Sequence, residues 1–259
     1  MIFIIGKKQR CKKPLFKFAK SKFDHEYIEY FSQNKFLLKN KKKTEKEIYN
    51  YILYCKHEIK IVFLINVSSI LKCNWTKFNT FISHGGSLPY YRGASVINWQ
   101  IINNEKYLTI SIVSFSKKLD SGYIIFEKKF LSNKPLTLIR PKIDEWYANS
   151  FLKISKILLE RKKLFFSKQI GKVSYWPNRT KIYSLVNIYL IKNYLDFKNL
   201  VFACEEGYWL NFYINEKDRV FISYCSKSFS KCLSLNRVFK GKIWKLKTIN
   251  FSCYVIQVL

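Results

Sequence analysis

The apolar run at residues 61–65, Ile-Val-Phe-Leu-Ile, constrains the fold of this chain more than any other segment. Five consecutive apolar residues have no polar face, so a strand built from them needs to be covered on both sides. That is typical of a strand inside a parallel sheet packed between helices. Residues 2–5 form a second apolar run, which ends at Gly6, and they predict another buried strand followed by a turn.

A helix is predicted between these two strands. Residues 44–47, Thr-Glu-Lys-Glu, match a capping box, in which a threonine and a glutamate three positions later satisfy the first amides of a helix. Apolar side chains follow at helical spacing, so we expect a helix over residues 45–57. Strand, helix and strand in this order indicate an α/β fold with a mostly parallel, Rossmann-like sheet flanked by helices.

The remaining pattern predicts where this α/β part ends. We expect strands at 78–83, 108–115 and 123–126, a helix at 94–104, and a long helical stripe from Ile143 to Phe165. After residue 171 the apolar runs are short, rich in aromatic and β-branched residues, and separated by turn residues. We therefore predict a catalytic-type domain over residues 1–170 and a small β-rich C-terminal domain over 171–259.

Composition narrows the class of protein only partly. Lys and Arg number 47 against 17 Asp and Glu, a net charge of +30, but the excess is spread as +12, +9 and +9 over residues 1–80, 81–170 and 171–259. Such an even spread is compatible both with polyanion binding and with a compositional bias. Seven cysteines without metal-ligand or disulfide spacing indicate reduced thiols and no metal site. With no apolar stretch long enough to span a bilayer, we expect a soluble cytoplasmic protein.

The residues most suited to chemistry follow the predicted strand at 78–83. The segment reads Phe81-Ile82-Ser83-His84-Gly85-Gly86-Ser87-Leu88-Pro89-Tyr90-Tyr91-Arg92-Gly93. His84 is thereby placed just beyond the carboxyl end of a strand, where open α/β sheets form their ligand crevice. An imidazole in that place is a candidate general base.

This segment resembles the Asn-x-His-x-Ser-Leu-Leu-Pro-x-Tyr-Arg-Gly signature of the formyltransferase superfamily, which includes methionyl-tRNA and amino-sugar N-formyltransferases. Residues 119–122, Leu-Asp-Ser-Gly, resemble its Leu-Asp-Thr-Gly element, and 36 positions separate His84 from Asp120, as the family pattern requires. The resemblance covers roughly residues 60–127. It implies a formyltransferase-type fold and an enzyme that takes its formyl group from 10-formyltetrahydrofolate, without a metal.

The resemblance also implies roles for individual residues. His84 would accept or share the proton of the attacking amine, and Asp120 would hold the imidazole in its useful tautomer. Arg92 would either shape the turn before the next helix or contact the substrate. The folate pocket would be lined by the loop after His84 and by the segment before Asp120, namely Gly85, Gly86, Ser87, Leu88, Pro89, Lys117 and Lys118.

One position departs from the family pattern, because the asparagine expected two residues before the histidine is Ile82. Residues two apart on a strand share a face, so position 82 lies beside the imidazole of His84. The resemblance implies that an amide there serves as the oxyanion donor. Loss of one such donor typically lowers the rate by about 10²–10³-fold. Among nearby polar residues, Asn66, Asn79, Ser83 and Ser87 give no clear replacement, so an impaired enzyme is one expectation.

The acceptor is predicted from smaller features. His84-Gly85-Gly86 with Leu88-Pro89, and Asn98-Trp99-Gln100, are more similar to the amino-sugar branch, so we expect an amino-sugar nucleotide as acceptor. Initiator methionyl-tRNA is the alternative that the positive charge favours. A non-catalytic descendant that only binds its ligand is the third. The sequence does not indicate an oligomeric state.

Overall fold

The two apolar runs form central strands of an eight-stranded sheet in the computed structural model, which describes residues 1–31, 35–67, 70–179, 185–204, 209–213, 219–239 and 241–258. Strand β1 (Ile2–Gly6) pairs in parallel with β2 (His25–Tyr30) on one side and β5 (Ile61–Ile65) on the other. Every residue of β1 and β5 is buried. The prediction of strands covered on both faces is confirmed.

The sheet is mixed, with its parallel strands at the centre. Its order is β4-β3-β2-β1-β5-β6-β8-β9, and β5 pairs in parallel with β6 (Asn79–His84). Antiparallel pairs extend it on both sides, β2 with β3, β3 with β4, and β6 with β8. The outer strands are β3 (Lys35–Leu38), β4 (Lys41–Thr44), β8 (Tyr107–Ser114) and β9 (Ile124–Leu131).

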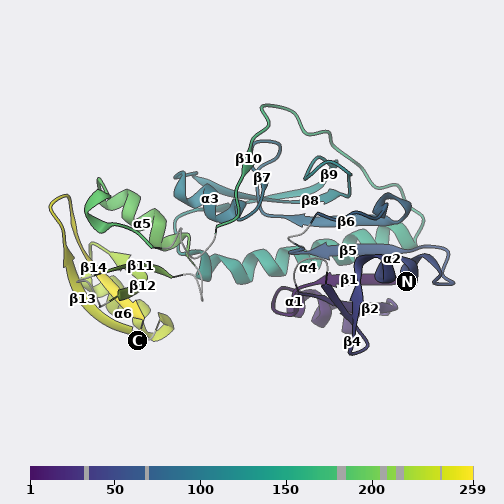
Figure 1. The fold of residues 1–259 in the computed structure, drawn as a ribbon, viewed down its shortest axis with the longest axis horizontal. Helices are drawn as coiled ribbons and strands as arrows, with labels where there is room; N and C mark the ends of the chain where they lie inside the picture. Colours follow the sequence, from purple (N-terminus) through teal and green to yellow (C-terminus); the bar gives the residue numbers. More distant parts are fainter. Residues whose placement is uncertain are drawn as a thin grey trace. The chain divides into compact units, whose positions relative to one another are not determined.

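Helices cover both faces of this sheet (Figure 1). On one face the ring of Phe63 in β5 lies 6.0 Å from Phe18 of α1 (Lys8–Ala19) and 4.4 Å from Phe151 of α4 (Leu136–Leu159). On the other face, residues 62 and 64 of the same strand pack in one apolar cluster with Ile48 and Ile52 of α2 (Glu45–Leu53). This alternation follows from the two-residue period of a strand.

All three predicted helices differ from their predicted bounds, and the helix expected over 94–104 is the shorter α3 (Val96–Ile102). The capping box at Thr44 and Glu47 is present, but α2 ends at Leu53 rather than residue 57, and the ammonium of Lys60 binds the carbonyl of Leu53. Helix α4 begins seven residues before Ile143, in spite of Pro141. It stops before Phe165 because Arg161 adopts a left-handed φ of 54° and the amide of residue 162 bonds back to residue 157, a common helix ending.

The described residues form two compact units. The first comprises Met1–Ala94, Thr109–Lys129 and Pro141–Tyr175, and the second comprises Ser95–Leu108, Phe130–Arg140 and Trp176–Leu259. The sheet face described above and the predicted reactive residues belong to the first unit. Among the described residues, no helix combines the length and apolar character needed to cross a membrane.

The second unit contains a separate antiparallel sheet of four strands in the order β11-β12-β14-β13. Helix α5 (Tyr194–Phe202) packs on this sheet, and the ring of its last residue, Phe202, lies 5.7 Å from the ring of Tyr224 in the sheet. The strands are β11 (Leu210–Tyr213), β12 (Arg219–Ser226), β13 (Gly241–Lys247) and β14 (Ser252–Val258), and the other helices of the unit are α3 (Val96–Ile102) and α6 (Phe229–Phe239). The predicted β-sheet content after residue 171 is confirmed, while α5 and α6 were not predicted.

Candidate active site

His84 is the last residue of β6, at the carboxyl edge of the parallel strands. Its side chain is 5% exposed, and its carbonyl accepts a 2.7 Å hydrogen bond from the hydroxyl of Tyr147 in α4. The ring nitrogen Nε2 lies 2.6 Å from the carbonyl oxygen of Tyr91. A carbonyl can only accept, so Nε2 carries a proton in this arrangement.

Asp120 lies in the turn between β8 and β9 and reaches the other side of the same ring. Its Oδ1 is 3.6 Å from Nδ1 of His84, and its Oδ2 accepts a 2.8 Å hydrogen bond from the backbone amide of Gly93. The predicted juxtaposition of His84 and Asp120 is thus confirmed, at a distance slightly longer than a direct hydrogen bond. Both ring nitrogens therefore face oxygen atoms, Nε2 the carbonyl of Tyr91 and Nδ1 the carboxylate of Asp120.

The loop after His84 folds tightly back on the imidazole. A Cβ atom at Gly86 would stand 2.5 Å from the carbonyl oxygen of Tyr91 and 3.0 Å from Nε2 of His84, so only glycine fits there. The amide of Tyr91 bonds to the carbonyl of Ser87 at 2.7 Å and closes the turn. Of the residues expected to line a folate pocket, Gly85 and Ser87 are partly exposed, whereas Gly86, Leu88 and Pro89 are buried.

The two lysines predicted to line the same pocket lie in the turn that leads to Asp120. Lys117 and Lys118 are both exposed. The carbonyl of Lys118 accepts hydrogen bonds from the amide and the hydroxyl of Ser121, at 3.2 and 2.9 Å. The backbone of this turn is therefore held in place while the two ammonium groups face solvent.

Arg92 points inward, with 6% of its surface exposed. Its Nε and Nη2 both donate to Oε1 of Gln169, at 3.1 and 2.7 Å, and its Nη1 donates to the hydroxyl of Tyr175 at 3.3 Å. These contacts fix the short strand β7 (Arg92–Gly93), where Gly93 adopts a left-handed φ of 102°. Of the two predicted roles, loop shaping is the one supported by these contacts.

Ile82 is partly buried and packs against the apolar cluster of Val62, Leu64 and their neighbours. Two of the polar residues considered as replacements for the missing amide, Asn79 and Ser83, are placed or bonded elsewhere. Asn79 starts β6, five residues before His84, and so lies about 16 Å away along the strand. The hydroxyl of Ser83 lies 3.4 Å from both the carbonyl of Leu64 and the amide of Asn66, so it bridges two backbone groups of the neighbouring chain segment.

Some residues of this site could not be recognised from their sequence. Tyr91 acts through its carbonyl and Gly93 through its amide, and backbone groups leave no trace in residue type. Tyr147 lies 63 positions after the carbonyl that it binds. Gln169 lies in an irregular segment with no pattern around it. Only the family signature at Tyr91, Arg92 and Gly93 offered a signal.

A cavity of about 320 Å³ lies at the opposite edge of the sheet, where β5 and β6 begin. Its lining includes Lys60, Lys77 and Asn79, and it does not include His84 or Asp120. We place the candidate site at the carboxyl edge instead, because the imidazole, the carboxylate and the glycine-rich turn meet there. In the described part of the chain, His, Cys, Asp and Glu side chains form no group of three or more suited to a metal ion.

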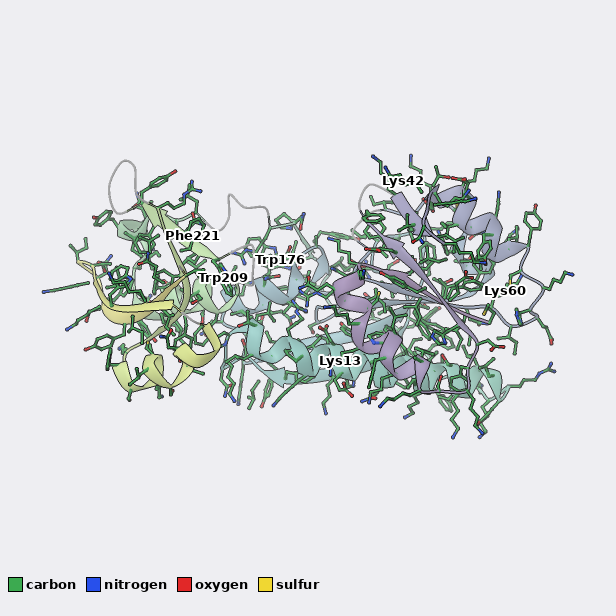
Figure 2. The ribbon with its side chains drawn as sticks, turned by 90° about the horizontal axis from the view of Figure 1, so that it is seen from below. Lys13, Lys42, Lys60, Trp176, Trp209 and Phe221 are labelled. Atoms are coloured by element: carbon green, nitrogen blue, oxygen red, sulfur yellow. The ribbon has the colours of Figure 1, made fainter. Side chains whose placement is uncertain are left out.

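Positive charge is also present away from this site. Figure 2 shows Lys13, Lys42 and Lys60 on different parts of the first unit. Some cations are paired, as in the 2.7 Å contact of Lys17 with Glu145, which joins α1 to α4. The charge distribution alone therefore does not define a nucleic-acid surface.

The fold is that of an α/β protein in which His84 and Asp120, the candidate reactive groups, lie together at the carboxyl edge of a mixed sheet. No protein-family model matches the chain. Methionyl-tRNA formyltransferase of Mycoplasma genitalium is 29% identical over 133 residues, which are 50% of this chain and 42% of that protein.

Solved structures with the same fold cover nearly the whole chain. The N-formyltransferase from Helicobacter canadensis, in a complex with folinic acid and dTDP-3-aminofucose, matches with a TM-score of 0.67 at 18% identity over 99% of this chain and 98% of that one. HypX from Aquifex aeolicus, in a complex with tetrahydrofolic acid, matches with a TM-score of 0.74 at 12% identity over 98% of this chain and 43% of that one.

These findings establish the formyltransferase fold and, with the sequence match, support a relationship to the formyltransferase superfamily. The match to the curated methionyl-tRNA formyltransferases spans less than half of their length, at 42%, 26% and 40% for the first three.

Proposed function

We propose that this protein is an N-formyltransferase that moves a formyl group from 10-formyltetrahydrofolate to a primary amine. The observation that carries the proposal is the pairing of His84 and Asp120, 3.6 Å apart at the carboxyl edge of the sheet. That is the position in which the superfamily motifs place their reactive residues, and the matched fold supports the assignment. We further propose that residues 1–170 form the catalytic-type domain and 171–259 an appended domain.

The residues present fit a folate donor. Gly85 and Ser87 offer partly exposed backbone beside the buried imidazole, and Lys117 and Lys118 offer exposed ammonium groups that suit a carboxylate-bearing ligand. When bound there, 10-formyltetrahydrofolate would supply the formyl carbon that the acceptor amine attacks. A pocket of this kind would use Gly86, Leu88 and Pro89 as its packed base.

In the proposed reaction, His84 takes the proton that the amine loses as its nitrogen bonds to the formyl carbon. The same proton then leaves with the nitrogen that loses the formyl group, so the imidazole returns to its starting state. Asp120 stabilises the charged ring and fixes its orientation from the Nδ1 side. Proton acceptance at Nε2 requires a neutral ring whose own proton is on Nδ1, facing Asp120. In that tautomer Nε2 no longer donates to the carbonyl of Tyr91, so their 2.6 Å contact is given up and the turn at 87–91 moves during turnover.

As acceptor we propose an amino-sugar nucleotide, with initiator methionyl-tRNA as the alternative. The similarity of residues 84–89 and 98–100 to the amino-sugar branch supports the first. The sequence match to methionyl-tRNA formyltransferases and the net charge of +30 support the second. A formyl-transfer assay that offers 10-formyltetrahydrofolate with a panel of amino-sugar nucleotides and with charged initiator tRNA decides between them.

The assay needs a matched inactive variant, for which His84→Gln is suited because it keeps a polar side chain of similar size. Transfer by the natural protein to one acceptor class, lost in His84→Gln, supports the proposal. If the folded protein binds a folate but transfers to neither class, a non-catalytic ligand-binding role replaces it. Ile82 at the amide position is the observation that favours this second function.

A further inference from the structure

We propose that Gln169 is a positioning residue that holds the Asp120 turn and thereby sets the contact between Asp120 and His84. This inference rests on the proposed function, since it concerns the same pair. Gln169 lies 49 positions after Asp120, in the segment between α4 and β10 (Tyr175–Trp176). In Figure 1 the chain leaves α4, runs past β9 and returns at β10 beside β7.

The carboxamide of Gln169 uses all of its hydrogen-bonding capacity at this site. Its Nε2 donates to the carbonyl oxygens of Asp120 and Gly122, at 2.7 and 2.8 Å. Its Oε1 accepts from Nε and Nη2 of Arg92, at 3.1 and 2.7 Å. Two donors and two acceptor positions are what an amide side chain offers, so no other residue type of this length reproduces the set.

These bonds hold Asp120 from two directions. One of the two bonds from Nε2 of Gln169 fixes the peptide carbonyl of Asp120. The Oε1 bonds fix Arg92, whose neighbour Gly93 donates to Oδ2 of Asp120. The chain of contacts from Gln169 through Arg92 and Gly93 thus returns to the carboxylate, so a shift of the Gln169 amide changes both the backbone and the side chain of Asp120.

The backbone of Asp120 needs such support. It has a left-handed φ of 48°, a conformation that is unfavourable for a residue other than glycine and persists only where its surroundings impose it. Gly122 is constrained by its neighbours instead, because a Cβ atom there would stand 1.7 Å from the carbonyl oxygen of Ser114. Gln169 binds the carbonyls of both residues and so bridges this strained turn.

The segment around Gln169 is anchored without its side chain. The backbone of Ser167 exchanges hydrogen bonds of 2.9 and 2.8 Å with Ile124, and the backbone of Ser174 bonds to Pro89 and Arg92 at 3.3 and 3.1 Å. Substitution of Gln169 therefore leaves the course of the segment intact. The effect is expected at the Asp120 turn rather than in the fold as a whole.

The test compares Gln169→Glu with Gln169→Leu. Glutamate keeps the acceptors for Arg92 but turns an oxygen toward the carbonyls of Asp120 and Gly122, whereas leucine removes both functions. Tyr175→Phe is the matched control, because it removes another hydrogen bond of Arg92 while both bonds from Gln169 to the Asp120 turn remain. We expect kcat for formyl transfer to fall in both Gln169 variants by up to about 10²-fold, as for a misplacement of about 1 Å, with KM little changed.

A second measurement separates this inference from the proposed function. The ¹⁵N chemical shifts of the His84 ring report the surroundings of Nδ1 whether or not formyl is transferred. Changed Nδ1 shifts in both Gln169 variants, with unchanged shifts in Tyr175→Phe, support the inference even if the natural protein proves inactive. If Gln169→Glu has the same kcat and the same Nδ1 chemical shift as the natural protein, the inference is wrong. Gln169→Glu alone is enough for this test if Gln169→Leu fails to fold.

Discussion

At the residue scale, the position that most affects the proposed chemistry is Ile82. It shares a strand face with His84, and packs against the apolar cluster of β5. We expect Ile82→Asn to raise formyl transfer by up to about 10²–10³-fold, because an amide there supplies the oxyanion donor that the isoleucine lacks. The measurement is kcat in the transfer assay with the preferred acceptor.

The control for this prediction is Ile82→Leu, which changes the shape of the side chain but adds no donor and should not raise kcat. Ile82→Asn is also expected to lower the free energy of unfolding by about 1–3 kcal/mol, because it puts an amide among apolar neighbours. If the natural protein already has a high kcat and Ile82→Asn has a lower one, another group serves as the oxyanion donor.

The proximity of His84 and Asp120 could be predicted from the sequence, but the groups that hold them could not. His84 and Asp120 stand in recognisable motifs, and each motif follows a strand of the same sheet. Tyr91 and Gly93 act through backbone atoms, whose partners depend on the path of the chain. Gln169 contacts Asp120 only because the irregular segment after α4 returns to the site, and no local pattern predicts that path.

At the element scale, Glu45 ties the start of α2 to the segment before β6. Its side chain is 6% exposed, and its Oε1 accepts from the amides of residues 72 and 73 at 2.8 and 2.7 Å and from the indole of Trp75 at 3.0 Å. We expect Glu45→Gln to lower the free energy of unfolding by about 1–3 kcal/mol, because it removes the charge that strengthens these bonds and places an NH₂ group against the Lys72 amide, which donates to Oε2 at 3.1 Å. Urea denaturation measures the change.

Glu47→Gln is the matched control in the same helix. It keeps an acceptor for the Thr44 amide in the capping box and lies at the surface, so its cost should be clearly smaller. Equal losses for the two variants would mean that the Glu45 contacts contribute no more than an exposed cap. The comparison separates the contribution of the hydrogen bonds accepted by the buried Glu45 from that of the exposed helix cap at Glu47.

Glu47 itself makes the stability of α2 depend on pH. Hydrogen bonds from Lys43, and then from the backbone and hydroxyl of Thr44, lower the pKa of Glu47 from 4.5 to about 2. A carboxyl whose folded pKa is depressed stabilises the fold fully above the unfolded pKa and loses that contribution as the pH falls through the folded one. The contribution should therefore disappear between about pH 4.5 and 2.

Unfolding at low salt over this pH range, for the natural protein and for Glu47→Gln, measures the effect. The difference between the two proteins is expected to shrink as the pH falls, because glutamine does not titrate. The groups are exposed, so the amplitude is small and decreases with added salt. A difference that stays constant from pH 6 to pH 2 would contradict the assignment.

Element prediction succeeded where one physical signal dominated. Residues 61–65 form β5 with the predicted bounds, because a wholly apolar run has few alternatives to a buried strand. Helix α1 went unrecognised because Pro14 interrupts its interior, its first residue lacks a side-chain cap, and only Cys11, Pro14 and Phe18 are buried. Helix α4 begins before Pro141 and packs on β5 through Phe151, whose ring lies 4.4 Å from that of Phe63. Tertiary contacts, which the sequence does not display, decided both cases.

At the scale of the whole molecule, the question is whether the net charge of +30 serves an acceptor. Lys41 and Lys42 are exposed on β4, which forms one edge of the eight-stranded sheet, and charged side chains on an edge strand discourage pairing with other chains. Lys43 pairs with Glu47 at 2.8 Å. These lysines therefore have a structural explanation that does not involve a polyanion.

We accordingly expect formyl transfer to depend only weakly on salt. A protein that neutralises 6–10 phosphates of a nucleic acid loses about 10³–10⁵ in affinity between 50 and 200 mM salt, whereas a sugar nucleotide offers only a diphosphate. The measurement is kcat/KM against salt for the natural protein and for the Lys41→Gln, Lys42→Gln double variant, which should behave alike. Steep salt dependence that becomes shallower in the double variant would instead place a tRNA acceptor along the β4 edge.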